Sequence, residues 1–268
     1  MPSSENIGAF ASAAKAPAHR PITALSQRST PVLGARYWVL ITLCSIAGCN
    51  LGDFISLYLN LGHWIGLAPL AVLFAILLIG ERIGRPSEMW YWALLLVVRA
   101  AATNLADFFS HTLNIDYSWA IAGLEGLEVL LVLGVSPRQR DETSGIYGRP
   151  ATDGWYWAAL AIAGALGTAI GDCTAETFQL GTAAGTAVLG AIYAVLLVVG
   201  FRVRWSTQAS YWLAVVAVRA AGTTAGDWLA CPDGGLGLGL IISTILTCSI
   251  FIAMPMVWRP RECAGNTA

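Results

Sequence analysis

The fold is decided by a stretch that recurs four times, and its first copy, at residues 37–53, reads YWVLITLCSIAGCNLGD. The copy opens with a Tyr-Trp pair and ends on an aspartate 16 positions after the tyrosine. The later copies keep the pair and the spacing: they are YWALLLVVRAAATNLAD at 91–107, YWAALAIAGALGTAIGD at 156–172 and YWLAVVAVRAAGTTAGD at 211–227. Recurrence at a fixed spacing indicates an internal repeat of one structural unit.

Each copy opens an apolar run, and a second apolar run follows before the next copy begins. Most of the eight runs approach the roughly 20 residues that a membrane-spanning helix needs. Composition agrees, because 56% of the 268 residues are hydrophobic and only 12% are charged, about half the charged share of a soluble domain. We therefore predict an all-α integral membrane protein with eight transmembrane helices, arranged as four tandem, parallel two-helix repeats. The runs lie at 37–60, 64–80, 90–114, 118–135, 155–179, 183–201, 210–230 and 235–257.

The basic residues lie on one side of the predicted bundle. Thirteen of the 15 Lys and Arg residues fall in the two tails and in three connectors, whereas four very short connectors contain neither. The positive-inside rule then places both termini in the cytoplasm. Residues 1–36 are predicted to be a disordered cytoplasmic tail, and residues 258–268 a second tail. Between them lies the membrane domain, 37–257, with repeats at about 37–80, 91–134, 156–201 and 211–257.

The composition and motifs exclude or disfavour several functions. A net charge of -1 gives no reason to expect nucleic acid as a partner. The single lysine, Lys15, lies in the N-terminal tail, so a retinal Schiff base within the bundle is excluded. The six cysteines form neither a CxxC site nor a disulfide framework, and no nucleotide-binding or HExxH motif is present, so we expect no cofactor. An enzyme is the least favoured class, because the loops are too short to build a substrate pocket outside the bilayer.

The sequence resembles a family of bacterial integral membrane proteins built from four tandem two-helix repeats, each with a conserved tryptophan. The resemblance covers about residues 37–257. It rests on the tryptophan of each Tyr-Trp pair and on the Gly-Asp step that ends three of the copies, whereas Ala106-Asp107 departs from that step. The family is catalogued as a repeat of unknown function. The resemblance implies the eight-helix topology and a bacterial inner-membrane location, but it transfers no activity.

Aromatic and small residues keep register in all four copies. Tyr and Trp are enriched at the headgroup level of membranes, so we interpret the tryptophans as membrane anchors; recognition of an aromatic ligand is the alternative. Small residues stand one and five positions before each aspartate, and such pairs let helix backbones approach closely. We therefore predict packing seams between the first helices of the repeats. The tryptophans are Trp38, Trp92, Trp157 and Trp212.

Polar side chains follow one face of each first helix, since steps of four residues stay on one face. Such groups are costly in lipid, so they should point into the bundle. Sixteen residues at a ~1.5 Å rise place the aspartates roughly 24 Å into a ~30 Å core, which makes one layer in its outer half. We predict that this layer binds a cation. The predicted ligands are Asp53, Asp107, Asp172, Asp227, Asn50, Asn104, Thr103, Thr168, Thr223 and Glu176.

Inside the spans, acidic side chains outnumber basic ones by seven to two. We expect Arg99, Arg219, Glu125 and Glu128 to be charge partners of the site. Buried carboxylates without compensation are costly, so the remaining acids should be protonated, face water or bind cations. The structural alternative is that the arginines are locked in ion pairs and that the Gly-Asp steps cap helix breaks. Arginine occurs in the second and fourth repeats, which suggests a pseudo-two-fold axis along the membrane normal.

Three functional hypotheses remain open. The leading one is a small inner-membrane transporter or permease for a divalent metal or a proton-linked cation. Oxygen ligands favour hard ions such as Mg²⁺ or Mn²⁺, whereas the Asp107/His111 and Asp227/Cys231 pairs suit softer first-row metals. The alternative is a non-transporting membrane scaffold or assembly protein whose charges form structural ion pairs, and an enzyme comes last. The partners expected are the lipid bilayer and a metal cation or proton.

Overall fold

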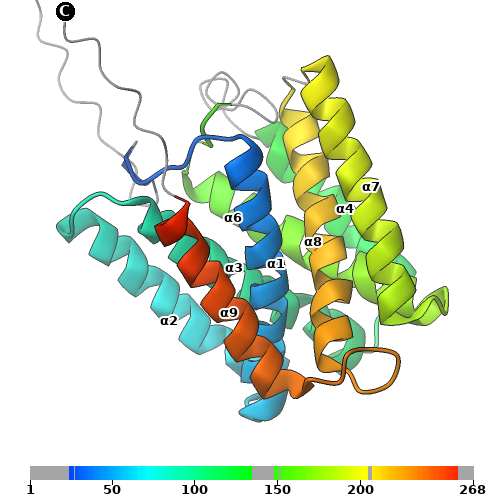
Figure 1. Cartoon of the computed structure of the whole chain (residues 1–268). Coiled ribbons are helices and arrows are strands. Elements are labelled where there is room, and N and C mark those ends of the chain that lie inside the picture. The colour runs from blue at the N-terminus through cyan, green and yellow to red at the C-terminus, as the bar shows by residue number, and fades with distance from the viewer. Residues whose placement is uncertain (1–23, 27, 135–147, 151, 205–206, 259–268) are drawn as a thin grey trace, which may run out of the picture.

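The computed structural model describes residues 24–26, 28–134, 148–150, 152–204 and 207–258, and these fold into eight α-helices with no β-strand among them (Figure 1). Seven of the helices are long and apolar enough to cross a membrane. The all-α, multi-pass prediction is therefore confirmed. The remaining helix, α8, is 23 residues long, but Arg219, Asp227 and several hydroxyl groups make it less apolar. The helices are α1 (Ala35–Asp53), α2 (Gly62–Ile83), α3 (Glu88–Asp107), α4 (Tyr117–Gly134), α6 (Gly154–Asp172), α7 (Gly181–Val203), α8 (Gln208–Ala230) and α9 (Gly239–Val257).

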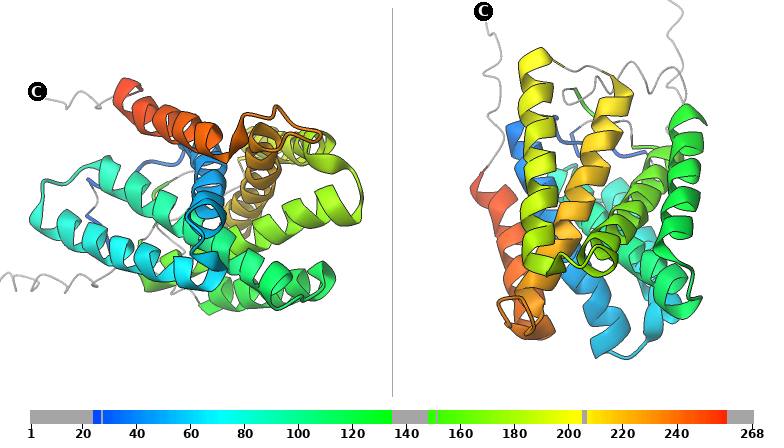
Figure 2. Two further views of the ribbon diagram at one scale, coloured as in Figure 1. Left: turned by 90° about the horizontal axis from the view of Figure 1, so that it is seen from below. Right: turned by 90° about the vertical axis from the view of Figure 1, so that its right-hand side faces the viewer.

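Four helices form a closed inner ring. Contacts run from α1 to α3, from α3 to α6, from α6 to α8 and from α8 back to α1 (Figures 1 and 2). These are the helices that carry the repeated Tyr-Trp pair near their first turn and the repeated aspartate near their last. The ring therefore brings the four copies of the motif around one central axis.

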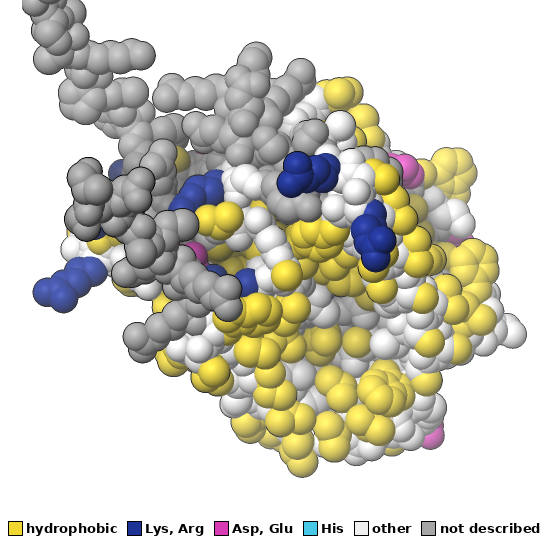
Figure 3. Space-filling view, turned by 45° about the horizontal axis from the view of Figure 1, so that its top comes forward, with side chains coloured by type: hydrophobic (Ala, Val, Ile, Leu, Met, Phe, Trp, Pro, Cys, Tyr) yellow, Lys and Arg dark blue, Asp and Glu magenta, His cyan; other side chains and the backbone are white. Residues whose placement is uncertain are grey.

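Each outer helix packs against the inner helix that follows it in the chain. Thus α2 packs on α3, α4 on α6 and α7 on α8, while α9 returns to α1 and closes the circle. The free faces of the outer helices expose apolar side chains such as Leu130, Val195 and Ile245, as a lipid-facing surface requires. In Figure 3 apolar side chains cover the flank of the bundle, and the Lys and Arg side chains in view lie toward the end where α1 begins.

Small residues bring the inner helices into close contact, and the predicted seams are confirmed. A methyl group added to Gly48 of α1 would lie 2.7 Å from Cβ of Arg99 in α3. One added to Gly164 of α6 would lie 2.6 Å from Cβ of Ala102 in α3. Separations this short are not tolerated, so a larger residue at either glycine would force the helices apart.

The Tyr-Trp pairs lie inside the bundle, so their interpretation as lipid-facing membrane anchors is wrong. The four tryptophans are 1% to 5% exposed and pack edge-on against the tyrosines, as Trp92 does on Tyr91 with ring centroids 5.1 Å apart. They are buried because their helices form the inner ring. Exposed tryptophans occur near other helix ends, for example Trp64 and Trp119, where an interfacial position suits them. The buried residues are Trp38, Trp92, Trp157 and Trp212.

The four repeat tyrosines close a ring of hydrogen bonds near the start of the inner helices. The hydroxyl of Tyr37 lies 2.9 Å from that of Tyr91 and 2.8 Å from that of Tyr211. The hydroxyl of Tyr156 lies 2.6 Å from that of Tyr91 and 2.9 Å from that of Tyr211. A hydroxyl has one donor and can accept, so each group can donate one bond and accept one. The tyrosine ring thus closes the centre of the bundle at this end.

Residues 24–26 and 28–34 pack on the same end, so the predicted disordered tail is wrong over this part of residues 1–36. Leu25 and Leu33 are buried in the core cluster that contains the tyrosines. Ser29 Oγ donates a hydrogen bond to Glu81 Oε1 at 2.9 Å. These contacts hold the segment against the bundle, and α1 then begins at Ala35. The rest of the predicted N-terminal tail, and the predicted C-terminal tail beyond residue 258, lie outside the described residues.

At the opposite end, three inner helices change their winding directly after the repeated aspartate. Each continues as a five-residue π-helix, a wider turn that is frequent at functional sites. Seven residues after the aspartates, Asn60, Asn114 and Gln179 take a left-handed backbone with φ of 55°, 52° and 55°. In the fourth unit α8 ends at Ala230, and Gly234 has φ 78° at the same offset. The π-helices are η1 (Phe54–Tyr58), η2 (Phe108–Thr112) and η3 (Cys173–Thr177).

Candidate cation-binding site

The four repeat aspartates converge on one pocket at the end of the bundle with the short connectors. Its volume is about 430 Å³. Each inner helix contributes its aspartate and the residue four positions before it, as expected for groups on one helical face. The layer predicted from depth therefore forms one cluster and not four separate ones. The predicted ligands that line this acidic pocket are Asp53, Asp107, Asp172, Asp227, Thr103, Thr168, Thr223 and Glu176.

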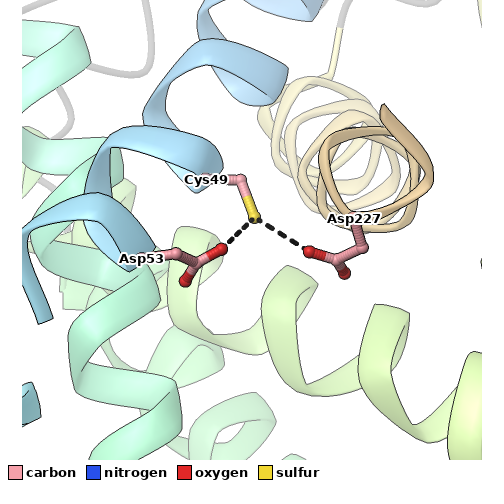
Figure 4. A group of neighbouring side chains, drawn as sticks. All are labelled: Cys49, Asp53 and Asp227. Carbon is pink, nitrogen blue, oxygen red and sulfur yellow. Dashed lines mark hydrogen bonds between the residues drawn. The ribbon is translucent and has the colours of Figure 1, made fainter. Parts of the chain in front are cut away.

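One half of the acidic pocket holds a sulfur and two carboxylates. Cys49 and Asp53 come from α1 and Asp227 from α8, and their ligand atoms lie within 4.8 Å of one another. Figure 4 shows the Cys49 thiol between the two carboxylates, 3.9 Å from Asp53 Oδ2 and 4.0 Å from Asp227 Oδ1. Thiolate and carboxylate together suit a first-row transition metal.

The other half of the acidic pocket holds an imidazole and two carboxylates. His111 lies one turn beyond Asp107, and with Asp172 of α6 they form a second group whose ligand atoms are within 4.8 Å of one another. A second imidazole approaches from the start of α2, with His63 Nδ1 3.6 Å from Asp107 Oδ2. The predicted Asp107/His111 pair is therefore part of this group. Cys231, the predicted partner of Asp227, lines the same pocket but does not join either group.

The aspartates act on one another as like charges. The charges of Asp107, Asp227 and Asp53 all act on Asp172, and those of Asp53 and Asp227 act on Asp107. Within the described part of the chain no arginine or lysine forms an ion pair with any of them. A bound cation would offset this repulsion, because buried carboxylates are tolerated when they are paired or coordinate a metal.

Arg99 closes the inner end of the acidic pocket without being the ion-pair partner that the sequence suggested. It is fully buried. One terminal nitrogen donates to Thr103 Oγ1 at 2.8 Å and to Thr168 Oγ1 at 2.9 Å, and the other to Thr223 Oγ1 at 2.7 Å. The arginine thus reaches from α3 to α6 and α8 through neutral hydroxyls. The positive charge of Arg99 still acts on the carboxylate of Asp53.

The other predicted charge partners do not pair either. Among the described residues, no side-chain nitrogen of Arg219 and no carboxylate oxygen of Glu128 has a hydrogen-bond partner. Glu125 is exposed on α4. Because α4 is an outer helix that packs mainly on α6, its glutamates lie outside the ring that holds the arginines. The prediction of Arg219, Glu125 and Glu128 as charge partners of the site is therefore wrong, whereas the charge of Arg99 does act on the site.

Asn50 and Asn104 lie outside the acidic pocket, so their prediction as ion ligands is also wrong. Asn50 Nδ2 donates to Thr247 Oγ1 of α9 at 3.5 Å. The Asn104 amide faces α2, where a methyl group on Gly66 would lie 2.8 Å from its Nδ2. Both residues stand three positions before an aspartate. With 3.6 residues per turn, a residue three positions before an aspartate and a residue four positions before it lie on opposite sides of that aspartate around the helix. The residues four positions before line the acidic pocket, so the asparagines turn away from it toward the outer helices.

The structure adds Cys49 and His63 to the residues that line the acidic pocket. Cys49 occupies in α1 the position that threonine holds in the other three copies, and this register is the signal that could have identified it. His63 belongs to a short turn and carries no repeat signal. Cys231 lies at the rim, directly after α8. Burial, together with the negative charges of Asp227 and Asp53, raises the pKa of its thiol.

Between the arginines and the start of the inner helices, the central axis of the bundle is closed. Twelve positions before the aspartates, the inner helices contribute Ile41, Leu95, Leu160 and Val215, all fully buried. The tyrosine ring follows one turn further on. The acidic pocket is therefore separated from the basic end of the bundle by an apolar layer and by the ring of hydroxyls.

Residues 210–262 match the sequence model of a family described as a Repeat of Unknown Function (DUF347). The match covers α8 and α9, the fourth of the predicted units, and it agrees with the resemblance to a repeat family of unknown function. No curated protein and no solved structure matches the chain.

Proposed function

We propose that this protein is a small transporter or permease for a cation in the inner membrane of a bacterium. The observation that carries the proposal is the convergence of four aspartates from four helices on one pocket within a membrane protein. Uncompensated carboxylates in such a place are costly, and a cation would offset their repulsion. We propose that the protein is not an enzyme and requires no cofactor beyond the ion it carries.

The transported ion is proposed to be a divalent first-row metal. The two groups of ligands combine carboxylates with a thiol in one case and with an imidazole in the other. Such mixed sets suit Mn²⁺ or Zn²⁺ better than Mg²⁺, which prefers oxygen ligands and retains its waters. A proton-linked mechanism is compatible with this site, because a carboxylate that releases a metal can take up a proton.

The proposed topology comprises four tandem, parallel repeats of two helices, with both termini in the cytoplasm and eight crossings of the bilayer. It rests on the basic residues of the connectors and on the shared offsets of the aspartates and left-handed turns. In this orientation the acidic pocket opens to the outside. An ion that moves inward next meets Arg99, the apolar layer and the tyrosine ring. Transport then requires a second state in which these three barriers rearrange.

The test measures metal uptake into proteoliposomes that contain an internal metal-sensitive dye. We expect uptake by the wild type and its loss when Asp53, Asp107, Asp172 and Asp227 are all changed to Asn. Asp233→Asn is the matched control, since Asp233 lies exposed in the connector after α8 and outside the acidic pocket; this variant should transport normally. Equal uptake by the quadruple variant, with folding shown by its elution and helicity, would refute the proposal.

A non-transporting scaffold is the second candidate, and it is favoured by the closed axis between the acidic pocket and the tyrosine ring. In that case the aspartates belong to a structural polar network, and single Asp→Asn changes should lower thermal stability. Metal ions should then leave the melting temperature unchanged. A cation site predicts the opposite, because a ligand that binds the folded state stabilises it. Melting curves with and without Mn²⁺ or Zn²⁺ therefore separate the two candidates.

A further inference from the structure

A second pocket lies on the outer surface of the bundle, between α4, α6 and α8, with a volume of about 460 Å³. We refer to it as the α4 groove. Helix α6 separates the two pockets: its Thr168 and Asp172 line the acidic pocket, and its Leu166 and Ile170 line the α4 groove. Most residues of the α4 groove are apolar, as expected of a surface that faces lipid.

The α4 groove contains a buried carboxyl group that the fold leaves unpaired. Glu128 is 6% exposed, and within the described ranges neither of its oxygens has a hydrogen-bond partner. The indole N–H of Trp212, which also lines the groove, is likewise without a partner in the part of the chain that the structure describes. Unsatisfied buried polar groups are costly, so both groups point to a ligand that completes them.

The repeat shows what is missing at this place. Glu128 stands 37 positions after Tyr91, and at the same offset the first and third repeats have Phe74 and Tyr193. Those two side chains pack on inner tryptophans: Phe74 lies edge-on to Trp157, with centroids 5.5 Å apart, and Tyr193 contacts Trp38, with centroids 6.5 Å apart. Glu128 has no ring to place on Trp212, which is the next tryptophan in this pattern. The α4 groove therefore lies where the first and third repeats put an aromatic side chain, whereas the fourth repeat has Cys248 at this offset.

We propose that the α4 groove binds an organic cation with an aromatic or apolar body. The body would fill the place that Phe74 and Tyr193 occupy in their repeats, and the charge would pair with Glu128. An anion would be repelled by Glu128 and Glu125. A lipid acyl chain would fill the groove but leave the carboxyl group unpaired, so a cation fits both features. The site is independent of the acidic pocket and of the proposed metal transport.

Tetraphenylphosphonium is the probe, measured by equilibrium dialysis against the full chain in phosphatidylcholine nanodiscs, with empty nanodiscs as the blank. We expect saturable binding by the wild type. Glu128→Gln keeps the shape and removes the charge, so binding should weaken about thirtyfold or more, as for loss of one partner of a buried charge pair. The quadruple Asp→Asn variant of the acidic pocket is the control and should bind as the wild type does.

A second variant guards against misfolding. Glu128→Phe supplies the ring found at Phe74, so it should abolish probe binding while it keeps or raises the melting temperature. Wild-type binding no greater than the blank would overturn the proposal, as would equal binding by Glu128→Gln. Equally tight binding of triphenylmethane, which carries no charge, would overturn it too and show a groove for acyl chains only.

Discussion

Replacement of Tyr91 by Phe opens the tyrosine ring and tests whether its four hydroxyls act as a unit. The change removes the bonds of 2.9 Å to Tyr37 and 2.6 Å to Tyr156. The three remaining hydroxyls then form an open chain through Tyr211, in which one buried O–H has no acceptor. Each lost bond is worth about 1 kcal/mol net, and an unsatisfied buried group costs about 1–3 kcal/mol. We expect the free energy of unfolding to fall by about 3–5 kcal/mol.

The quadruple Tyr→Phe variant separates the ring from four independent bonds. It leaves no hydroxyl unpaired, and replacement of both partners by apolar groups of the same shape is close to neutral. Its cost should therefore be far below four times that of Tyr91→Phe. The assay is unfolding in detergent micelles followed by circular dichroism, with Tyr58→Phe as control because Tyr58 is exposed. A cost for Tyr91→Phe no larger than the control, or strictly additive costs, would refute the reasoning.

Three further changes give measurable outcomes. Gly48→Ala should lower the free energy of unfolding by about 1–3 kcal/mol, because the added methyl group overpacks against α3. Gly190→Ala is the control: its methyl group meets no atom within 4 Å among the described residues, so this change should raise the free energy of unfolding by about 0.5–1 kcal/mol. Similar melting temperatures of the two variants would contradict this reasoning. Burial and the neighbouring carboxylates raise the pKa of the Cys231 thiol. Asp227→Asn should therefore lower that pKa and shift the pH profile of maleimide labelling of Cys231 to lower pH. An unchanged profile would show that the charge of Asp227 acts only weakly on the thiol. Asp172→Asn relieves like-charge repulsion and should raise the melting temperature in metal-free buffer by roughly 2–4 °C, about 1 kcal/mol, and a decrease would favour the scaffold.

Helix positions and the aspartate layer were predictable because both depend on local periodicity. The predicted run 210–230 and the observed Gln208–Ala230 differ by two residues at one end. When each π-helix is counted with the α-helix that it continues, the largest difference is at α9, predicted from 235 and observed from Gly239. There Gly234, Gly237 and Gly239 take positive φ and extend the connector. A glycine-rich apolar run is ambiguous between loop and helix until the chain's own turns are known.

The charge partners were not predictable in the same way. Arg99 binds three threonine hydroxyls from three helices, an arrangement that needs α3, α6 and α8 to meet at one depth. The sequence grouped Arg99 with Glu125 and Glu128 as charge partners of the site, but α4 places the two glutamates outside the ring. Pairing between helices depends on which of them are neighbours, and hydropathy carries no such information.

From the repeated spacing alone it follows that four aspartates share one depth and that one polar face lies on each first helix, because rise and rotation per residue are constant in an α-helix. The tertiary structure decided the order in which these first helices close the inner ring, and with it the burial of the tryptophans, the convergence of the aspartates on one pocket and the α4 groove beside Glu128. The physical reason lies in the membrane. Lipid and protein core are both apolar, so hydropathy separates a polar face from an apolar one but does not record which helices are neighbours, and close packing decides that.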